Sequence, residues 1–314
     1  MRAVRASGDG GVTVVDVEPT IPAHATDPVR VRVRSCGICG SDLHLAAWNL
    51  PVTLGHEFAG VLDDGTAVAV QPNVWCGECD RCLAGETQLC RTGLTRMHGV
   101  SVDGGLADEV IVDRSCLVPL PTGVDAEIGA LVEPLAVAGH ALRRVVLEPG
   151  ARILVIGGGS IGLALAGVAR AQAVDVDLSA RYAHQHEAGE RLGARLAVAD
   201  EYDVVVDAAG SQASLDDAVT RVRPGGTIVV AATYWEPVSF GTDLLGKEVH
   251  VVPAAMYGHD HGIREFDLAA EVLAAHPDLG DVLVSHRFPL DDAAEAFRVS
   301  GDRASGAIKV VLGP

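Results

Sequence analysis

The chain has 314 residues, 48% of them hydrophobic, and a formal net charge of −18. Its length accommodates two domains of ordinary size, and its composition is typical of a packed α/β protein rather than a disordered one. The strong negative charge argues against nucleic acid and against anionic membrane surfaces as partners.

Neither the first residues nor the apolar segments indicate secretion or membrane insertion. Residues 1–9 lack the apolar core of a signal peptide. The longest apolar run, residues 153–169, is interrupted by consecutive glycines and would make a poor membrane span. We therefore expect a soluble, cytoplasmic protein.

The first third of the chain has the pattern of a compact β-rich domain. Apolar and polar residues alternate in short segments, which predict strands at residues 12–17, 29–33, 68–71 and 109–112. Turns rich in Gly and Pro separate these segments. After Pro121 the character changes, and residues 127–146, rich in Ala and Leu, predict helices.

Two short motifs in the β-rich third carry a candidate catalytic metal site. Cys39 offers a thiolate and His56 an imidazole, the donor pair that a catalytic zinc prefers. Glu57 adds a carboxylate that can approach or support the metal. Groups that could supply and remove a proton lie between Cys39 and His56: Ser41, Asp42 and His44. An isolated Cys/His pair is usually a buried cysteine and a core histidine, but here other motifs supply what a metal enzyme needs.

The cysteines predict a second, structural metal site. Four of the seven follow the spacing Cys-x2-Cys-x2-Cys-x7-Cys: Cys76, Cys79, Cys82 and Cys90. Two-residue spacers direct successive thiolates at one centre, and four cysteine ligands leave no open position for a substrate, so we predict a structural zinc. An iron–sulfur cluster is the main alternative, although it would need an electron-transfer context. Cys36 and Cys116 are interpreted as structural residues.

Residues 152–162 predict a dinucleotide-binding turn. An apolar strand at 152–156 runs into Gly157, Gly159 and Gly162, with Ser160 and Ile161 among them, and a helical stretch follows at 163–171. Such glycines allow backbone N–H groups at the start of a helix to approach a pyrophosphate. Strands and helices then alternate, which predicts a parallel, doubly wound sheet, at residues 174–178, 185–192, 203–207, 211–222, 227–232 and 249–253. A last helix and strand are expected at 291–299 and 307–312.

These motifs, in this order, resemble those of the zinc-dependent medium-chain alcohol dehydrogenases, and in particular the branch that contains sorbitol and threonine dehydrogenases. The resemblance covers essentially the whole chain: residues 39–44, residues 55–57, the four cysteines, residues 133–135 and the glycine-rich turn. It implies an α/β architecture in which a GroES-like, β-rich catalytic domain is interrupted by a Rossmann domain with a doubly wound parallel sheet. We expect the catalytic domain at residues 1–130, completed by 285–314, and the Rossmann domain at 131–284.

Residue by residue, the resemblance implies two zinc ions per chain, one catalytic and one structural. The catalytic zinc ligands are expected among Cys39, His56, Glu57 and Glu133, with Glu133 preferred to Glu57 as the carboxylate ligand. Glu57 is also a candidate for a supporting role in catalysis, behind the metal. Ser41 corresponds to the hydroxyl that receives the substrate proton, His44 to the group that relays it, and Asp42 to the carboxylate that orients His56.

The expected reaction is hydride transfer between NADP(H) and a small secondary or polyol-type alcohol, or the corresponding ketone. The strand after the glycine-rich turn is predicted to end at Ala180, with Arg181 next. A carboxylate there would repel a 2′-phosphate, whereas a small residue followed by arginine resembles the NADP-using members of the branch. The alternative is that Asp177 binds the ribose hydroxyls of NAD. We expect a homodimer or homotetramer.

Two other functions are compatible with parts of the sequence. A zinc-free quinone or enoyl reductase on the same fold would not need Cys39, His56 or the four cysteines. A nucleotide-binding protein without catalysis would be favoured by the loss of a metal ligand or relay residue, and all of these are present. Lysine occurs only at positions 247 and 309, the other basic residues being arginine, and we assign no function to that bias.

Overall fold

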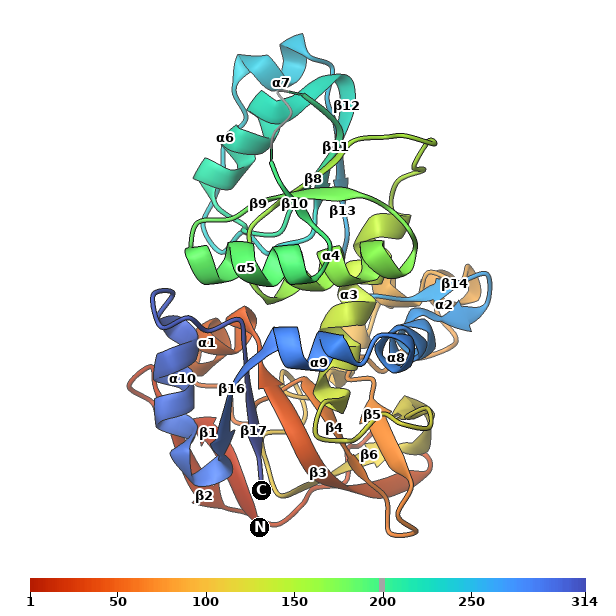
Figure 1. Cartoon of the computed structure of the whole chain (residues 1–314). Coiled ribbons are helices and arrows are strands. Elements are labelled where there is room, and N and C mark those ends of the chain that lie inside the picture. The colour runs from red at the N-terminus through yellow and green to blue at the C-terminus, as the bar shows by residue number, and fades with distance from the viewer. Residues whose placement is uncertain (198–200) are drawn as a thin grey trace. The chain divides into compact units, whose positions relative to one another are not determined.

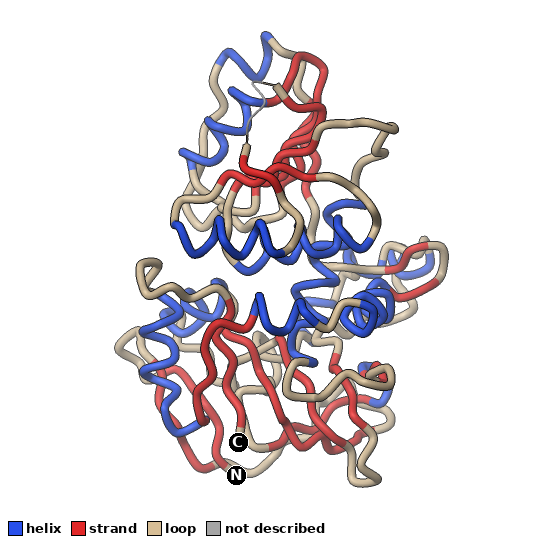
Figure 2. Tube along the Cα trace, viewed as in Figure 1, coloured by secondary structure: helices blue, strands red, loops and turns tan. Residues whose placement is uncertain are grey.

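The computed structural model describes residues 1–197 and 201–314, which form two compact units (Figure 1). Unit 1 comprises Met1–Glu133 together with Gly258–Pro314, and unit 2 is Pro134–Tyr257. The α/β class is confirmed, with strands dominating unit 1 and a parallel sheet flanked by helices in unit 2 (Figure 2).

Unit 1 is built on a mostly antiparallel sheet with β3 at its centre; among its described strands, β16 and β17 pair in parallel. In the described residues seven strands form this sheet, in the order β16-β17-β3-β4-β5-β7, with β6 paired to β3 as well. Its strands are β3 (Pro28–Ile38), β4 (Glu57–Val61), β5 (Ala67–Val70), β6 (Glu109–Asp113), β7 (Leu117–Pro119), β16 (Val284–Pro289) and β17 (Lys309–Gly313). Separate two-stranded pairs are formed by β1 (Arg2–Ala6) with β2 (Val12–Asp16), and by β14 (His259–Asp260) with β15 (Ile263–Arg264).

The helices of unit 1 are α1 (Gly40–Ala47), α2 (Asp80–Leu83), α8 (Glu265–Ala275), α9 (Asp278–Leu283) and α10 (Ala293–Gly301). One apolar core, which includes Val31, Phe58 and Val112 from the sheet and Phe297 from α10, holds the first and last parts of the chain together. Because β17 pairs with β3, the C-terminal strand lies next to the strand that leads to Cys39.

Unit 2 has the doubly wound sheet that the alternating pattern predicts. In its described residues six strands pair in parallel in the order β10-β9-β8-β11-β12-β13. The chain starts in the middle at β8, moves outward to β10 and returns beside β8 with β11, so the strand order reverses between β8 and β11. Ligands of such sheets bind beyond the carboxyl ends of the strands at this switch point.

The strands of unit 2 are β8 (Ile153–Ile156), β9 (Val176–Ser179), β10 (Arg195–Leu196), β11 (Tyr202–Asp207), β12 (Val222–Val230) and β13 (His250–Pro253). Its helices are α3 (Val132–Arg143), whose first two residues belong to unit 1, α4 (Ser160–Ala171), α5 (Ala183–Arg191), α6 (Gln212–Arg221) and α7 (Thr242–Gly246). Edge strand β10 has only two residues.

The second boundary between the units lies at residues 257/258, earlier than the expected 284/285. The segment between these positions forms β14, β15, α8 and α9, and specific bonds attach it to unit 1. The guanidinium of Arg264 donates hydrogen bonds to the carbonyl oxygens of Ser115 and Leu117, at 3.0 and 3.2 Å. The sequence pattern gave no signal for these bonds because they join residues about 150 positions apart. No helix in the described part of the chain is both long and apolar enough to cross a bilayer.

His98 gives the fold a measurable dependence on pH. Its ring is fully buried, packs against Phe58 with centroids 6.2 Å apart, and donates from Nδ1 to the carbonyl oxygen of Asp103 at 2.7 Å. Burial penalises the charged imidazolium and lowers the pKa of His98 to about 4. An unfolded chain would bind a proton on this histidine near its ordinary pKa of about 6.5.

The first prediction follows from this difference. Between about pH 6.5 and pH 4 the unfolded state gains a proton on His98 that the native state does not, so stability falls as the pH falls. Denaturant unfolding should show about 2 kcal/mol of this loss between about pH 7 and pH 5, and His98→Gln should lack that share. Equal pH dependence in the two proteins would contradict the assignment.

Candidate functional site

The candidate catalytic metal site forms where β3 ends and β4 begins. Cys39 is the N-cap of α1, directly after β3, and His56 directly precedes β4. The antiparallel register of these strands, with Gly37 opposite Glu57, carries both motifs to the same end of the sheet. Ligand atoms of Cys39, His56 and Glu57 all lie within 4.8 Å of one another, so the three can hold a metal ion.

Gly55 determines where His56 is placed. Its φ is +92°, a conformation that side chains other than glycine rarely adopt. A Cβ at this position would lie 2.6 Å from both the Cys36 sulfur and Leu106 Cγ, which are buried. The backbone can therefore turn tightly into β4 only with glycine here, and the turn directs His56 toward Cys39.

Asp42 contacts both Cys39 and His56, two of the candidate metal ligands. This carboxylate is fully buried; Oδ2 accepts the backbone N–H of Cys39 at 2.9 Å, and Oδ1 lies 3.3 Å from Nδ1 of His56. Burial opposes a charge on His56, but the neighbouring Asp42 and Cys39 outweigh it and raise the pKa of His56 well above its ordinary value. A carboxylate at Nδ1 leaves Nε2 of the imidazole available as a metal ligand.

Ser41 and His44 extend from this centre toward the surface. The Ser41 hydroxyl lies 3.4 Å from Nε2 of His56, next to the nitrogen that a metal would use. His44 is exposed and follows three residues later on α1, hence on the same face of the helix. Ser41 thus lies at the candidate metal site, and His44 lies at the exposed surface of the same helix.

Lys309 is a site residue that our sequence analysis missed. Its ammonium donates to Oε1 of Glu57 at 2.7 Å and lies 2.6 Å from Oε2, and both side chains are almost completely buried. Burial alone would lower the pKa of Lys309, but the charges of Glu57 and Cys39 raise it, so the ammonium stays charged. The sequence contained a signal for this residue, because one of only two lysines in an arginine-rich chain lies in an apolar C-terminal strand.

Glu133 is buried in the first turn of α3. It is not one of the three residues whose ligand atoms lie within 4.8 Å of one another, yet its charge is close enough to raise the pKa of Lys309. Two carboxylates, Glu57 and Glu133, thus stand beside the Cys39–His56 pair, and the first of them is already engaged by an ammonium.

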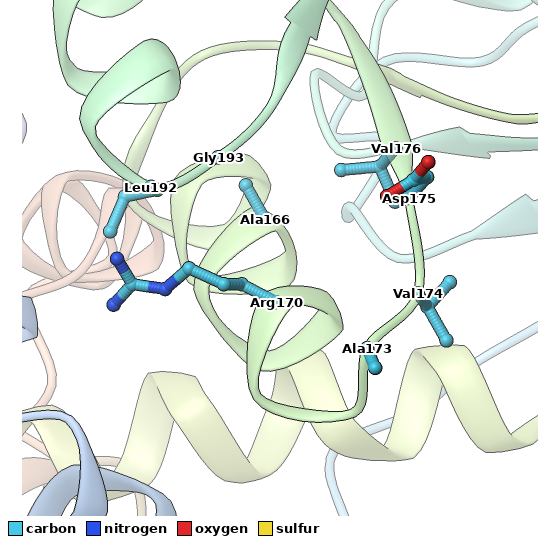
Figure 3. A pocket seen from close by; sticks show the side chains of 8 residues that line it. All are labelled: Ala166, Arg170, Ala173, Val174, Asp175, Val176, Leu192 and Gly193. Atoms are coloured by element: carbon cyan, nitrogen blue, oxygen red, sulfur yellow. The ribbon is translucent and has the colours of Figure 1, made fainter.

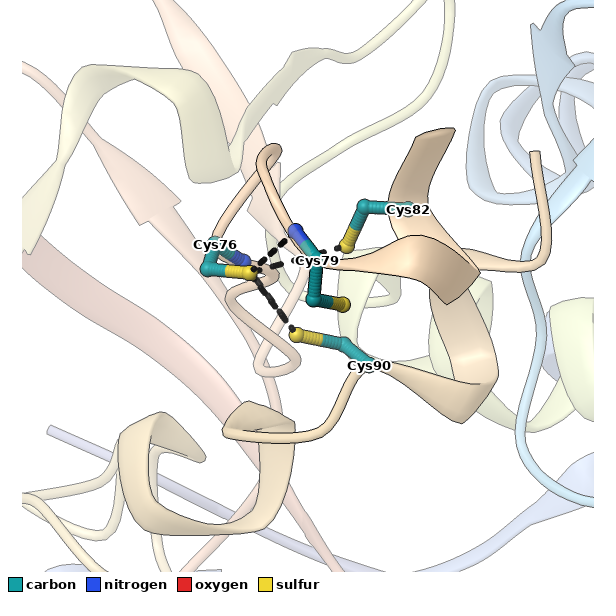
Figure 4. Close-up of side chains that lie close together, drawn as sticks. All are labelled: Cys76, Cys79, Cys82 and Cys90. Atoms are coloured by element: carbon teal, nitrogen blue, oxygen red, sulfur yellow. Dashed lines mark hydrogen bonds between the residues drawn. The ribbon is translucent and has the colours of Figure 1, made fainter. Parts of the chain in front are cut away.

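The four predicted cysteines converge on one point (Figure 4). The sulfur of Cys76 is 3.9 Å from that of Cys82 and 3.6 Å from that of Cys90. A tetrahedral zinc with Zn–S bonds of about 2.3 Å places its sulfurs about 3.8 Å apart, so the spacing fits one ion. An iron–sulfur cluster would hold the sulfurs farther apart because each binds a different iron.

Backbone N–H groups point at the sulfurs of this cluster and favour the thiolate form of Cys79. The N–H groups of Cys76 and Cys79 point at the sulfurs of Cys90 and Cys76, at 3.3 and 3.4 Å. Those of Arg91 and Cys82 lower the pKa of Cys79 to about 6, which favours the thiolate that binds metal. The seven cysteines, all within the described residues, form no disulfide.

The glycine-rich turn joins β8 to α4 as predicted. Gly157 has a φ of +109°, and a Cβ at Gly162 would overlap the carbonyl oxygen of Gly157. Gly159 is the N-cap of α4, and Ser160 and Ile161 begin the helix. The first N–H groups of α4 therefore have no helical partners and can receive a phosphate.

The end of β9 is within one residue of the predicted position. The strand ends at Ser179, and Ala180 lies against the turn, because a Cβ on Gly158 would come 2.7 Å from Cβ of Ala180. Arg181 is exposed, with its guanidinium 5.8 Å from the ring centroid of Tyr182. Asp177 is buried inside the sheet, where it accepts from Arg195 Nε at 3.0 Å and from the Tyr202 hydroxyl at 2.8 Å.

A pocket of unit 2 lies away from the glycine-rich turn, at the amino end of β9 (Figure 3). It is lined by Ala166, Arg170, Ala173, Val174, Asp175, Val176, Leu192 and Gly193. These residues gather around the amino end of β9, whereas nucleotides bind beyond the carboxyl ends of such strands. We assign this pocket no part in cofactor binding.

Comparisons with known proteins identify the class to which this fold and these motifs belong. Residues 25–122 match the alcohol dehydrogenase GroES-like domain. The chain is 30% identical over 311 residues to L-galactonate-5-dehydrogenase of Escherichia coli K12, covering 88% of this chain and 89% of that protein. It is 29% identical to sorbitol dehydrogenase of Arabidopsis thaliana, covering 96% and 93%.

A crystal structure of a zinc-binding dehydrogenase from Sinorhizobium meliloti 1021 with bound NADP superimposes with a TM-score of 0.86 at 30% identity, covering 100% of this chain and 99% of that one. The chain therefore belongs to the zinc-dependent medium-chain dehydrogenases. Within them it falls in the branch of sorbitol dehydrogenase, and it is an oxidoreductase that acts on CH–OH groups with a nucleotide cofactor.

Proposed function

We propose that this protein is a zinc-dependent dehydrogenase that oxidises a secondary hydroxyl of a small polyol or sugar acid with NADP⁺, and reduces the corresponding ketone in reverse. The observation that carries the proposal is the convergence of Cys39, His56 and Asp42 at the end of β3. The substrate class is supported by the relatives, which are named for a sugar acid and a polyol.

The donor set fits a catalytic zinc. Cys39 supplies a thiolate, and Nε2 of His56 is directed into the site because Asp42 occupies the Nδ1 side. We assign the third protein ligand to Glu133, since Lys309 already binds both oxygens of Glu57. A thiolate and a carboxylate would balance the two positive charges of the ion.

Bound zinc would supply a Lewis acid that lowers the pKa of a substrate hydroxyl, and bound NADP⁺ would accept the hydride. The residues of this chain would supply the proton transfer and the orientation of His56. Ser41, next to His56, would accept the hydroxyl proton, and His44 on the same face of α1 would pass it to solvent. Asp42 would keep the imidazole in one orientation throughout.

The residues around the end of β9 support NADP as the preferred cofactor. Asp177, the alternative ribose ligand, is buried and bonded to Arg195 and Tyr202. Ala180 removes the repulsion that a carboxylate would exert on a 2′-phosphate, and Arg181 offers a charge-assisted partner. The Sinorhizobium structure was determined with NADP.

The second prediction concerns metal content. The purified chain should contain two zinc ions, one at Cys39 and His56 and one at the four cysteines. Cys39→Ala should lose one ion and all turnover while remaining folded, because the open site is not needed for the fold. Cys79→Ala should lose the other ion and unfold at a lower temperature, because binding of a structural ion contributes folding energy. A wild-type chain with one zinc, or with iron, would contradict this assignment.

The third prediction concerns which of the two glutamates, Glu57 or Glu133, binds the catalytic zinc. Glu133→Gln should weaken zinc retention at the Cys39 site by about tenfold or more, since a neutral amide is a poor zinc ligand. Glu127→Gln, an exposed change six residues earlier, is the matched control and should retain zinc. Elemental analysis after dialysis against a chelator measures the effect. Wild-type zinc content in Glu133→Gln would rule out Glu133 as a ligand.

The fourth prediction concerns cofactor preference. Steady-state kinetics should give a higher kcat/KM with NADP⁺ than with NAD⁺. Arg181→Ala should lower the value for NADP⁺ by about tenfold to a hundredfold and leave that for NAD⁺ nearly unchanged, because only NADP⁺ carries the 2′-phosphate. The control is Arg191→Ala, which removes an exposed arginine at the carboxyl end of α5. A preference for NAD⁺ in the wild type would show that our interpretation of this strand end is wrong.

A further inference from the structure

A fully buried carboxylate, Asp207, lies at the carboxyl end of β11, beside the point where the strand order of unit 2 reverses. Its Oδ1 accepts the backbone N–H groups of Ala209 and Gly210, at 2.9 and 3.1 Å. Its Oδ2 accepts the hydroxyls of Ser214 and Tyr234, at 2.9 and 2.6 Å. A buried carboxylate needs such donors to be stable. Asp207 thereby joins three segments: the end of β11, the start of α6 and the segment that follows β12.

The turn after β11 lies against both the glycine-rich turn and the segment that follows β12. A Cβ on Gly157, in the glycine-rich turn, would lie 3.1 Å from the carbonyl carbon of Ala208. A Cβ on Gly210 would lie 2.7 Å from the carbonyl oxygen of Thr233, which follows β12. The segment after β12 is therefore close to the turn that we expect to receive the pyrophosphate.

Two side-chain attachments hold this segment in place. Residues 231–241 form neither helix nor strand. One attachment is the bond from the Tyr234 hydroxyl to Asp207; burial and this carboxylate raise the pKa of Tyr234, so the phenol keeps the proton that it donates. The other is Gln212, the first residue of α6. Its Oε1 accepts the N–H of Ser239 at 2.8 Å, and its Nε2 donates to the carbonyl oxygen of Ser239 at 3.0 Å.

The place of this segment indicates which half of the cofactor it would meet. A dinucleotide-binding sheet has two halves, and the cofactor lies across the crevice between them, at the switch point. The ends of β8 and β9 carry the glycine-rich turn, Ala180 and Arg181, which we assign to the pyrophosphate and the adenosine. The ends of β11 and β12, where Asp207 and Tyr234 lie, belong to the other half, which corresponds to the nicotinamide nucleotide.

We propose that Tyr234 is a positioning residue for the nicotinamide half of the cofactor. By donating to Asp207 it fixes the segment after β12 beside the carboxyl ends of β11 and β12, where that half would bind. The inference rests on the proposed nicotinamide-dependent function. It adds two residues, Tyr234 and Asp207, that none of the sequence motifs contains.

Removing one hydroxyl tests the proposal. Tyr234→Phe keeps the ring but loses the bond to the carboxylate, so the segment should lose its fixed position and the dissociation constant of NADPH should rise about tenfold. The ligand 2′,5′-ADP contains the adenosine half and lacks the nicotinamide. Its dissociation constant should stay within about twofold of the wild-type value. Titration calorimetry measures both constants without turnover.

The matched control is Tyr202→Phe. The Tyr202 hydroxyl also donates to a buried aspartate of unit 2, Asp177, at 2.8 Å, so its loss should likewise lower the unfolding temperature. It should leave the ratio of the two dissociation constants unchanged, because Tyr202 lies at the amino end of β11. A folded Tyr234→Phe protein with a lower unfolding temperature and an unchanged ratio would show that this hydroxyl serves only the fold, and would overturn the proposal.

If Tyr234→Phe does not fold, Gln212→Leu decides the question, because it removes the other attachment of the segment. It should raise the dissociation constant of NADPH and leave that of 2′,5′-ADP unchanged; equal effects on both ligands, or none, would overturn the inference. A wild-type protein that binds NADH and 5′-AMP instead would refute only the NADP preference, and the same comparison would then use that pair. A wild-type protein that binds neither reduced cofactor would refute the proposed function itself.

Discussion

The pairing of β3 with β4 and β17 is the constraint on which the candidate metal site depends. Its register puts Gly37 between Glu57 and Val311, and it delivers Cys39, His56 and Lys309 to one end of the sheet. A slip of one residue in β4 would turn Glu57 to the opposite face of the sheet. The C-terminal strand is therefore part of the site. The apolar core that packs β17 against β3 also keeps the site residues in position.

The two candidate metal sites are built in different ways. The four-cysteine site is local: its ligands lie within one short segment that includes helix α2, and backbone N–H groups of that segment lower the pKa of Cys79. The site at Cys39 is built from several segments that are distant in the sequence. Its side chains are positioned by the buried carboxylate of Asp42, which accepts the backbone N–H of Cys39 and lies next to the ring of His56. Four thiolates would leave a bound metal no open position, whereas three ligands at the Cys39 site would leave one for a substrate.

Local patterns in the sequence predicted most of what is local in the structure. The cysteine spacing, the glycine-rich turn and the strand before it need only short-range geometry, and the structure places them as expected. Lys309 could not be linked to Glu57 in this way, since 252 residues separate them. The boundary near residue 258 was missed for the same reason, because side-chain bonds from Arg264 to distant carbonyls attach that segment to unit 1. Asp177 shows the converse: its position near the end of β9 made it a candidate, and only its bonds to Arg195 and Tyr202 reveal a structural role.

The most direct test of the account is nicotinamide absorbance with a panel of polyols, sugar acids and simple secondary alcohols, before and after removal and restoration of zinc. The account predicts that NADP⁺ is reduced by compounds with a secondary hydroxyl, that a chelator abolishes this activity and that added zinc restores it. Reduction of quinones or enones that persists after the catalytic zinc is removed, with no alcohol oxidised, would contradict it.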